Sequence, residues 1–283
     1  MKTKVIVDST CDLSKSICEA YNLAVLPLHV LLGEAEHKDG VDIKIDDIYK
    51  WADENNDTPK TSAPSLNDAI DLLKQYKDEY EDIVCISISS SMSSSYNVFH
   101  MASIELDIED RTYLIDSKNL CNGVGYLAIV AGKLAMEDKS GQEITDELQT
   151  IIDKVNMNFI VDTLEYLYRG GRCSGAAALM SGTLKIHPKI VVENGEMKVS
   201  KKYRGVMNKV ILHYLKDQEE EIVASDPKYV FIAHSGLDEE IFQEAKEYIQ
   251  SLNHFDEIIE ERAGAVISSH CGPGTFGICY RSK

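Results

Sequence analysis

Short apolar runs alternate along the chain with longer stretches whose apolar residues recur at helical spacing. Runs rich in Val and Ile between polar or turn residues are typical of buried strands, and the amphipathic stretches are typical of helices. In the first half, this pattern predicts strands at residues 4–7, 25–32, 82–88 and 112–115, a loop or hairpin at 33–40, and helices at 13–21, 45–54, 65–80, 96–102, 119–136 and 142–155. Thr10 or Asp12 is expected to cap the first helix.

This alternation of strands and helices predicts a mostly parallel sheet with helices on both faces. In such sheets, ligands bind at the carboxyl ends of the strands. Polar residues follow three of the predicted strands, at Asp8-Ser9, at 89–95 and at Asp116-Ser117. We therefore expect a polar pocket at that edge of the sheet.

The pattern changes near residue 157. Asn194-Gly195 is a strong turn signal and predicts a hairpin between residues 185–192 and 196–199. The other elements expected in the second half are helices at 163–168, 174–181, 206–221 and 239–252, and strands at 157–162, 229–233, 257–261, 265–268 and 276–280. We predict an α/β protein of two domains, an N-terminal domain of residues 1–157 and a mixed α/β C-terminal domain of residues 158–283.

The run from Ser87 to Ser95 is rich in hydroxyl groups and lies between a predicted strand and a predicted helix. The unpaired N–H groups at a helix start, together with the helix dipole, attract anions. Such a pocket binds an anion without Lys or Arg. A run of serines is also common in a plain turn and helix cap, and the run alone leaves both interpretations open.

Composition and charge exclude several classes of protein. The 283-residue chain has a formal charge of −18, which repels nucleic acids. We expect no transmembrane segment, because no stretch approaches the roughly 20 apolar residues of a span, and no signal peptide, because Asp8 interrupts the first apolar run. Seven scattered cysteines without a CxxC pair are typical of reduced thiols. These observations predict a cytoplasmic protein.

The sequence lacks the common signatures of nucleotide, metal and hydrolase sites. It contains no GxxxxGKS/T, GxGxxG, HExxH or GxSxG motif, so we assign no metal ligand, cofactor or catalytic residue. His270 precedes the loop Gly272-Pro273-Gly274, where the glycines allow a ligand to approach the backbone closely. Arg169 and Arg172 flank two glycines at a helix end, which suits an oxyanion or simply the helix dipole. His234 follows a strand and is either a cleft residue or a packing residue.

Five motifs of this chain resemble those of the DegV family, and they occur in the family order. They are residues 8–13, 61–65, 88–96, 164–167 together with 170–172, and 270–275. Each motif is weak alone, but the five together are specific and span essentially the whole chain. The chain departs from the family pattern at Ser94-Ser95, where Gly-Thr is common, and at Ala63, where Gln is frequent.

The resemblance implies a protein that binds one long-chain fatty acid, such as palmitate, between its two domains. By the same resemblance, Thr61, Ser62, Ser93 and Ser94 hold the carboxylate, with His270 beside it. The departure at 94–95 leaves open which of the two serines binds. Burial of about 15 methylenes contributes roughly 12 kcal/mol before ordering costs, so the tail alone can anchor the ligand.

Members of the family serve as the fatty-acid-binding subunit of fatty acid kinase. The resemblance therefore implies a carrier that presents the carboxylate to a separate ATP-using kinase subunit and holds the acyl phosphate product, with transient contact to a membrane surface. Arg172 and Arg204 would contact the kinase or the phosphate.

Two other interpretations of the same residues are open. The first is a serine hydrolase acting on an acyl substrate, with Ser93 as the nucleophile and His270 as the base, although no orienting acid or oxyanion-hole motif is evident. The second is a regulatory protein that senses acyl chains and passes this state to a protein partner.

Overall fold

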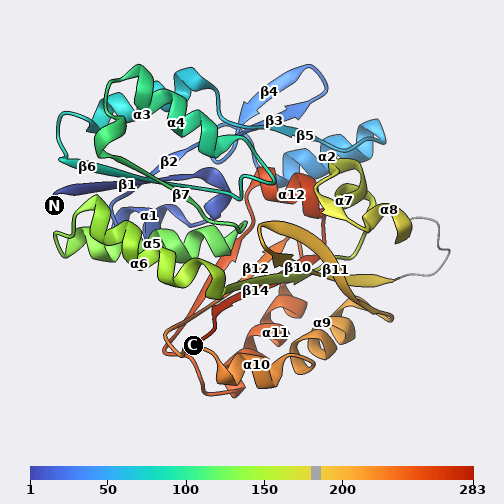
Figure 1. Ribbon diagram of the computed structural model, residues 1–283. Helices are drawn as coiled ribbons and strands as arrows, with labels where there is room; N and C mark the ends of the chain where they lie inside the picture. The colour runs from blue at the N-terminus through green and yellow to red at the C-terminus, as the bar shows by residue number, and fades with distance from the viewer. Residues whose placement is uncertain (180–185) are drawn as a thin grey trace.

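The computed structural model describes residues 1–179 and 186–283, which form three β-sheets surrounded by helices (Figure 1). A four-stranded sheet belongs to the N-terminal part of the chain, and a seven-stranded sheet belongs to the C-terminal part. Helix α12 (Ala265–Cys271) packs against the small third sheet, which comes from the N-terminal part. Residues near the C-terminus thus return to contact the first half of the chain.

The N-terminal sheet is entirely parallel, with the strand order β2-β1-β6-β7. Its strands are β1 (Thr3–Asp8), β2 (Leu23–Leu26), β6 (Asp82–Ser87) and β7 (Thr112–Asp116). Nearly continuous apolar residues in β1 and β6 are buried on both faces, as is typical of parallel sheets. Helices α3 (Leu66–Tyr76) and α4 (Ser95–Glu105) cover one face, and α1 (Lys15–Ala20), α5 (Asn122–Met136) and α6 (Gly141–Ile151) cover the other (Figure 1). The predicted parallel sheet with helices on both faces is confirmed.

The predicted strand at 25–32 is two strands that lie in different sheets. Pro27 lacks an N–H group and ends the first strand, β2. The second strand, β3 (His29–Leu32), pairs antiparallel with β4 (Ala35–Lys38) and β5 (Lys60–Ser62) in the small sheet. Helix α2 (Ile45–Asn55) connects β4 to β5 and contacts α12.

The C-terminal sheet is mixed, with the strand order β13-β12-β14-β8-β10-β11-β9. Its strands are β8 (Val155–Ile160), β9 (Cys173–Ser174), β10 (His187–Glu193), β11 (Glu196–Tyr203), β12 (Tyr229–Ser235), β13 (Glu257–Arg262) and β14 (Thr275–Arg281). The predicted hairpin is formed by β10 and β11, which turn at Asn194-Gly195. The predicted domain division at residue 157 falls within β8 and stays a prediction.

The two faces of the C-terminal sheet pack against different partners. Helices α9 (Met207–Lys216), α10 (Glu219–Ala224) and α11 (Glu239–Ser251) cover one face, where Phe276 and Ile278 point. The opposite face contacts α5, which also contacts β1 and β6 of the N-terminal sheet. Helix α5 therefore lies between the two large sheets, and one apolar core extends across both.

Several predicted elements have different bounds in the structure. The predicted helix at 206–221 is divided into α9 and α10. The predicted helix at 163–168 is α7 (Glu165–Gly170), which ends before Gly171 in the left-handed conformation (φ 67°). Within the predicted helix at 174–181, α8 covers Ala176–Leu179, and residues 180 and 181 lie outside the described part of the chain.

Two predictions, for residues 265–268 and for the cap of the first helix, are wrong. Residues 265–268 belong to a helix, α12, rather than to a strand. The N–H groups at its start donate hydrogen bonds to two carboxylates that are remote in the sequence. Gly264 N donates to Asp12 Oδ1 at 2.9 Å, and Ala265 N donates to Asp39 Oδ1 at 2.8 Å. Asp12 therefore accepts a hydrogen bond at the start of α12 rather than of α1. Helix α1 begins after Ser14, without a cap from Thr10 or Asp12.

Candidate functional site

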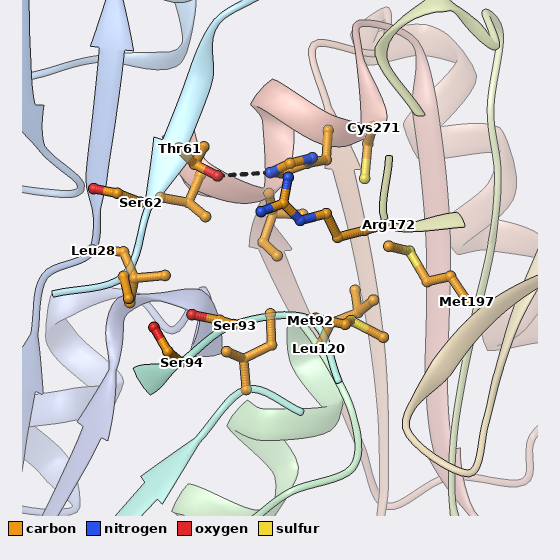
Figure 2. Close-up of a pocket in the computed structure, with 15 residues that line it drawn as sticks. Leu28, Thr61, Ser62, Met92, Ser93, Ser94, Leu120, Arg172, Met197 and Cys271 are labelled. Atoms are coloured by element: carbon orange, nitrogen blue, oxygen red, sulfur yellow. Dashed lines mark hydrogen bonds between the residues drawn. The ribbon is translucent and has the colours of Figure 1, made fainter. Parts of the chain in front are cut away.

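A cavity of about 120 Å³ lies between β5, the loops that follow β2, β6 and β7, helix α12 and the hairpin β10–β11 (Figure 2). Residues from distant parts of the chain line it: Leu28, Thr61, Ser62, Ala63, Ile88, Met92, Ser93, Ser94, Leu120, Arg172, Met197, Val266, Ile267, His270 and Cys271. Six of the seven predicted site residues are in this set. The seventh, Arg204, is exposed after β11 and does not line the cavity.

Thr61 and His270 form a hydrogen-bonded pair at the polar end of the cavity. Thr61 Oγ1 lies 2.8 Å from His270 Nε2 (Figure 2). Burial of the imidazole, together with the charge of Arg172, lowers the pKa of His270 to about 4, so the ring is neutral at pH 7. Thr61 in β5 and His270 in α12 thus join the two halves of the molecule at this point.

The surroundings of His270 select one neutral tautomer. Its Nδ1 atom is buried and has no hydrogen-bond partner among the residues that the structure describes. A buried N–H without a partner carries a desolvation cost, so we assign the proton to Nε2, which donates it to Thr61 Oγ1. The Thr61 hydroxyl proton is then free to donate to an anion in the cavity.

Gly170 lets the imidazole lie against the backbone of α7. A Cβ atom at Gly170 would stand 2.3 Å from His270 Nδ1, far inside van der Waals contact. The glycine at this position therefore allows the close approach of α12 to α7. The Gly-Gly pair was noted in the sequence only as a helix end, and its contact with His270 follows from the tertiary structure.

Asp8 holds the start of the serine-rich loop in place. Its carboxylate is buried and accepts hydrogen bonds from Ile88 N at 2.9 Å and from Thr10 N at 3.2 Å. Burial raises the pKa of Asp8 to about 6 in spite of these bonds. The sequence indicated Asp8 as a polar strand end, and the structure gives it the role of fixing the loop after β6.

The four predicted hydroxyl ligands lie in different environments. Ser93 is half-buried and its Oγ lies 2.9 Å from Ser95 Oγ, whereas Ser94 is exposed and its side chain makes no cap hydrogen bond to α4. The Thr61 hydroxyl faces His270, and that of Ser62 points away from it (Figure 2), as expected for successive residues of a strand. Both Ser93 and Ser94 line the cavity, so the choice between them as the carboxylate ligand stays open.

The residues of the proposed hydrolase do not form a catalytic arrangement. His270 Nε2 is hydrogen-bonded to Thr61, and no carboxylate in the described part of the chain pairs with its Nδ1 atom. Ser93 Oγ contacts Ser95 rather than an imidazole. Burial raises the pKa of the Cys271 thiol, which disfavours the thiolate that a nucleophile needs. This geometry provides no activated nucleophile at the cavity.

A second recess, of about 370 Å³, adjoins the polar end of the cavity. It shares Thr61, Arg172 and His270 with the cavity and adds the cationic side chains of Lys60 and Arg169. Arg169 pairs with Asp57 at 3.3 Å and with Glu165 at 2.7 Å. Arg172 instead donates to the carbonyl oxygen of Gly170 at 2.7 Å, and no carboxylate among the described residues pairs with it. Arg172 is therefore available to an anion in the recess.

The apolar wall of the cavity was not predicted. Its residues come from five separate segments of the chain: Leu28, Met92, Leu120, Met197 and Ile267. In the sequence, each of them has the surroundings of an ordinary core residue. Only the packing of these segments brings them together. A local signal existed for the polar residues alone, because hydroxyls after a strand and a His before a glycine-rich loop are recognisable in the sequence.

The described part of the chain contains neither a cluster of metal ligands nor a membrane-spanning helix. Over residues 1–179 and 186–283, no group of three or more His, Cys, Asp or Glu side chains is placed to hold a metal ion. Across the same part of the chain, none of the helices has the length and apolar character required to cross a membrane.

The fold and the cavity define an α/β protein whose internal site combines apolar walls with hydroxyl, imidazole and guanidinium donors. The chain belongs to the DegV family: the family model, described as "Uncharacterised protein, DegV family", matches residues 2–283. A DegV domain-containing protein of Clostridium acetobutylicum is 31% identical over 284 residues, covering 100% of this chain and 99% of the relative.

Solved structures of the family have the same fold. A DegV family protein from Thermus thermophilus, described by its fatty acid binding, superposes with a TM-score of 0.91 at 27% identity and covers 100% of both chains. A stearic-acid-binding protein from Eubacterium ventriosum superposes with a TM-score of 0.85 at 28% identity, covering 99% of this chain and 98% of the other.

Proposed function

We propose that this protein binds a long-chain fatty acid, with the carboxylate at the polar end of the cavity and the acyl tail between the apolar walls. The observation that carries the proposal is the pairing of Thr61 with a neutral His270 at the polar end of a cavity that also has apolar walls. The relatives from Thermus thermophilus and Eubacterium ventriosum bind fatty acids and have the same fold, which supports it.

The chemistry of the two ends suits such a ligand. A carboxylate that leaves water needs donors, and the hydroxyls of Thr61, Ser93 and Ser94 supply them, with the guanidinium group of Arg172 at the border with the recess. The apolar walls supply most of the binding free energy, because each buried methylene contributes about 0.8 kcal/mol. The hydroxyls thus determine which end of the acid faces the recess.

Native mass spectrometry of the purified protein tests this proposal. We expect a stoichiometric adduct with the mass of a fatty acid, which organic extraction releases, and a weaker adduct in Thr61→Val. If the protein stays ligand-free after incubation with several long-chain acids, the proposal is wrong.

We further propose that the protein is a carrier subunit rather than an enzyme, and that it presents the bound carboxylate to a separate fatty acid kinase subunit in the cytoplasm. The chain has no nucleotide-binding motif, so the phosphoryl donor would come with the partner. Arg172 stands in the recess next to the carboxylate end, where a guanidinium group stabilises a phosphoryl group in transfer. Arg204 lies outside the recess and suits a contact with the partner. Loading and release of the acid would involve transient contact with a membrane surface.

Reconstitution with a fatty acid kinase subunit and ATP tests the carrier role. We expect Arg172→Ala to yield at least tenfold less acyl phosphate per bound fatty acid than the wild type does. Arg262→Ala is the control, because Arg262 pairs with Asp46 and lines neither the cavity nor the recess. Equal yields from Arg172→Ala and the wild type would rule out this role for Arg172, and acyl phosphate formation without the kinase subunit would rule out the division of labour.

A further inference from the structure

A small second cavity, of about 20 Å³, continues from the apolar end of the first. The two cavities share Leu120, Ile267 and Cys271 as lining residues. The second cavity lies over the C-terminal sheet, where β8, β12 and β14 contribute its floor. An acyl tail that extends past Leu120 would therefore lie over the centre of this sheet.

The walls of this second cavity are apolar even where polar residues line it. Ser235 Oγ donates to the carbonyl oxygen of Gly272, and Thr275 Oγ1 donates to that of Cys271 at 3.1 Å. His234 Nδ1 accepts a hydrogen bond from Leu237 N at 3.1 Å. Because these groups are satisfied within the protein, the cavity presents carbon and sulfur to its contents, and it suits an alkyl chain rather than a polar group.

Gly277 lies at the floor of the second cavity, in the interior of β14. Its register partners are Ala233 in β12 and Phe159 in β8, so one row of the sheet carries two very small residues side by side. A glycine inside a strand costs about 0.5–1 kcal/mol relative to Ala, and it often marks a close approach to the backbone. Gly277 lines the second cavity together with Met157 and Phe159, whose side chains flank the position that its missing Cβ atom would take.

Met157 closes the cavity beyond Gly277. It belongs to the next row of the sheet, opposite Cys279, and a Cβ atom at Gly277 would stand 3.0 Å from its Cε. Cys279 itself is fully buried and does not line the cavity. The Met157 side chain thus folds over the glycine and ends the apolar path at this row.

We propose that Gly277 and Met157 together determine the length of the acyl chain that this protein accepts. The inference rests on the proposed function, since it takes the ligand of the first cavity to be a fatty acid. The terminal methyl group of the longest acid lies above Gly277 and against the thioether of Met157. A side chain at position 277 shortens this space, and a smaller side chain at position 157 lengthens it.

Competition among saturated acids, from lauric to arachidic acid, tests the inference by native mass spectrometry. Gly277→Ala is expected to shift the preferred length to shorter acids, with about fourfold weaker relative binding for each methylene excluded. The Gly277→Ala variant is expected to fold, because the atom nearest to its new methyl group is the flexible end of Met157 at 3.0 Å, and Phe159 Cβ at 3.3 Å has to shift by only a few tenths of an ångström. Met157→Ala is expected to shift the preference in the opposite direction, to longer acids.

Ala245→Val is the matched control. Ala245 is fully buried in α11 on the other face of the C-terminal sheet, so a change there perturbs the core without reaching the cavity. An unchanged length preference in both Gly277→Ala and Met157→Ala, in a protein that still binds acids, overturns the inference and leaves the proposed function intact. A wild-type protein that binds none of the acids overturns the proposed function, and the inference with it.

Discussion

Thr61 Oγ1 and His270 Nε2 lie 2.8 Å apart although the two residues are 209 positions apart in the sequence. This hydrogen bond connects β5 of the N-terminal part to α12, which lies in the chain between β13 and β14 of the C-terminal sheet. The polar end of the cavity therefore forms only when both parts of the chain are folded and packed together. Four predictions follow from this arrangement and from the contacts around it.

Thr61→Val keeps the shape of the side chain and removes its hydroxyl group. We expect the affinity for a long-chain fatty acid to fall about tenfold or more, because a hydrogen bond to a charged group contributes about 1.5–3 kcal/mol. Isothermal titration calorimetry measures the change. Ser62→Ala serves for comparison, since the Ser62 hydroxyl points away from His270 (Figure 2), and we expect a smaller loss. A larger loss in Ser62→Ala than in Thr61→Val would place the carboxylate on the other side of β5.

Gly170→Ala is expected to displace the imidazole of His270. The new Cβ atom would stand 2.3 Å from Nδ1, so α12 or the ring must move, and the bond to Thr61 is lost. We expect fatty acid affinity to fall by a factor similar to that of Thr61→Val, with little further effect when the two changes are combined. Gly171→Asn is the control, because a Cβ at Gly171 meets nothing within 4 Å and Asn tolerates its positive φ. Additive losses in the double variant would contradict a shared mechanism.

Because His270 is buried and neutral, we expect the free energy of unfolding to depend on pH. Its pKa is lowered from 6.5 to about 4 in the folded protein, so the unfolded chain takes up this proton first as the pH falls. The contribution of the neutral imidazole to the free energy of unfolding is complete above about pH 6.5. It is lost as the pH falls toward 4, by roughly 2–3 kcal/mol in total. Asp8, whose pKa is raised to about 6, acts in the opposite direction over an overlapping range.

Urea unfolding of the wild type and of His270→Gln is measured from neutral pH to about pH 4. The difference between the two stability curves isolates the contribution of His270, since Asp8 is present in both proteins. We expect the wild type to lose stability relative to His270→Gln as the pH falls. Parallel curves for the two proteins would mean that the imidazole titrates in the fold as it does in the unfolded chain.

The tip of the hairpin β10–β11 is attached to the serine-rich loop. Ser89 Oγ donates to the carbonyl oxygen of Gly195 at 2.7 Å, and Ser89 is buried. We expect Ser89→Ala to lower the free energy of unfolding by about 1 kcal/mol and to speed hydrogen exchange in the hairpin. Ser90→Ala is the control, because Ser90 binds Asp116 at the protein surface instead. Unchanged exchange in the hairpin of Ser89→Ala would show that other contacts hold the tip.

The sequence by itself determined the parallel sheet and the polar residues at its edge. Continuous apolar runs in β1 and β6 fit only strands that are buried on both faces, and the residues after such strands are polar because they lie outside the core. The Asn194-Gly195 turn was equally clear, since both residues adopt the positive φ angles (52° and 82°) that a tight hairpin requires. In each case, the signal comes from neighbouring residues.

Tertiary structure alone decided the identity of α12 and the shape of the cavity. Residues 265–268 resemble a strand locally and become a helix because Asp12 and Asp39, far away in the sequence, accept the hydrogen bonds of its first N–H groups. The positions of Leu120 and Met157 at the cavity, like that of Gly170 behind His270, depend on packing between segments that share no local pattern. Backbone hydrogen bonding and side-chain periodicity are local and can be read from the sequence, whereas the space between packed elements depends on the whole chain.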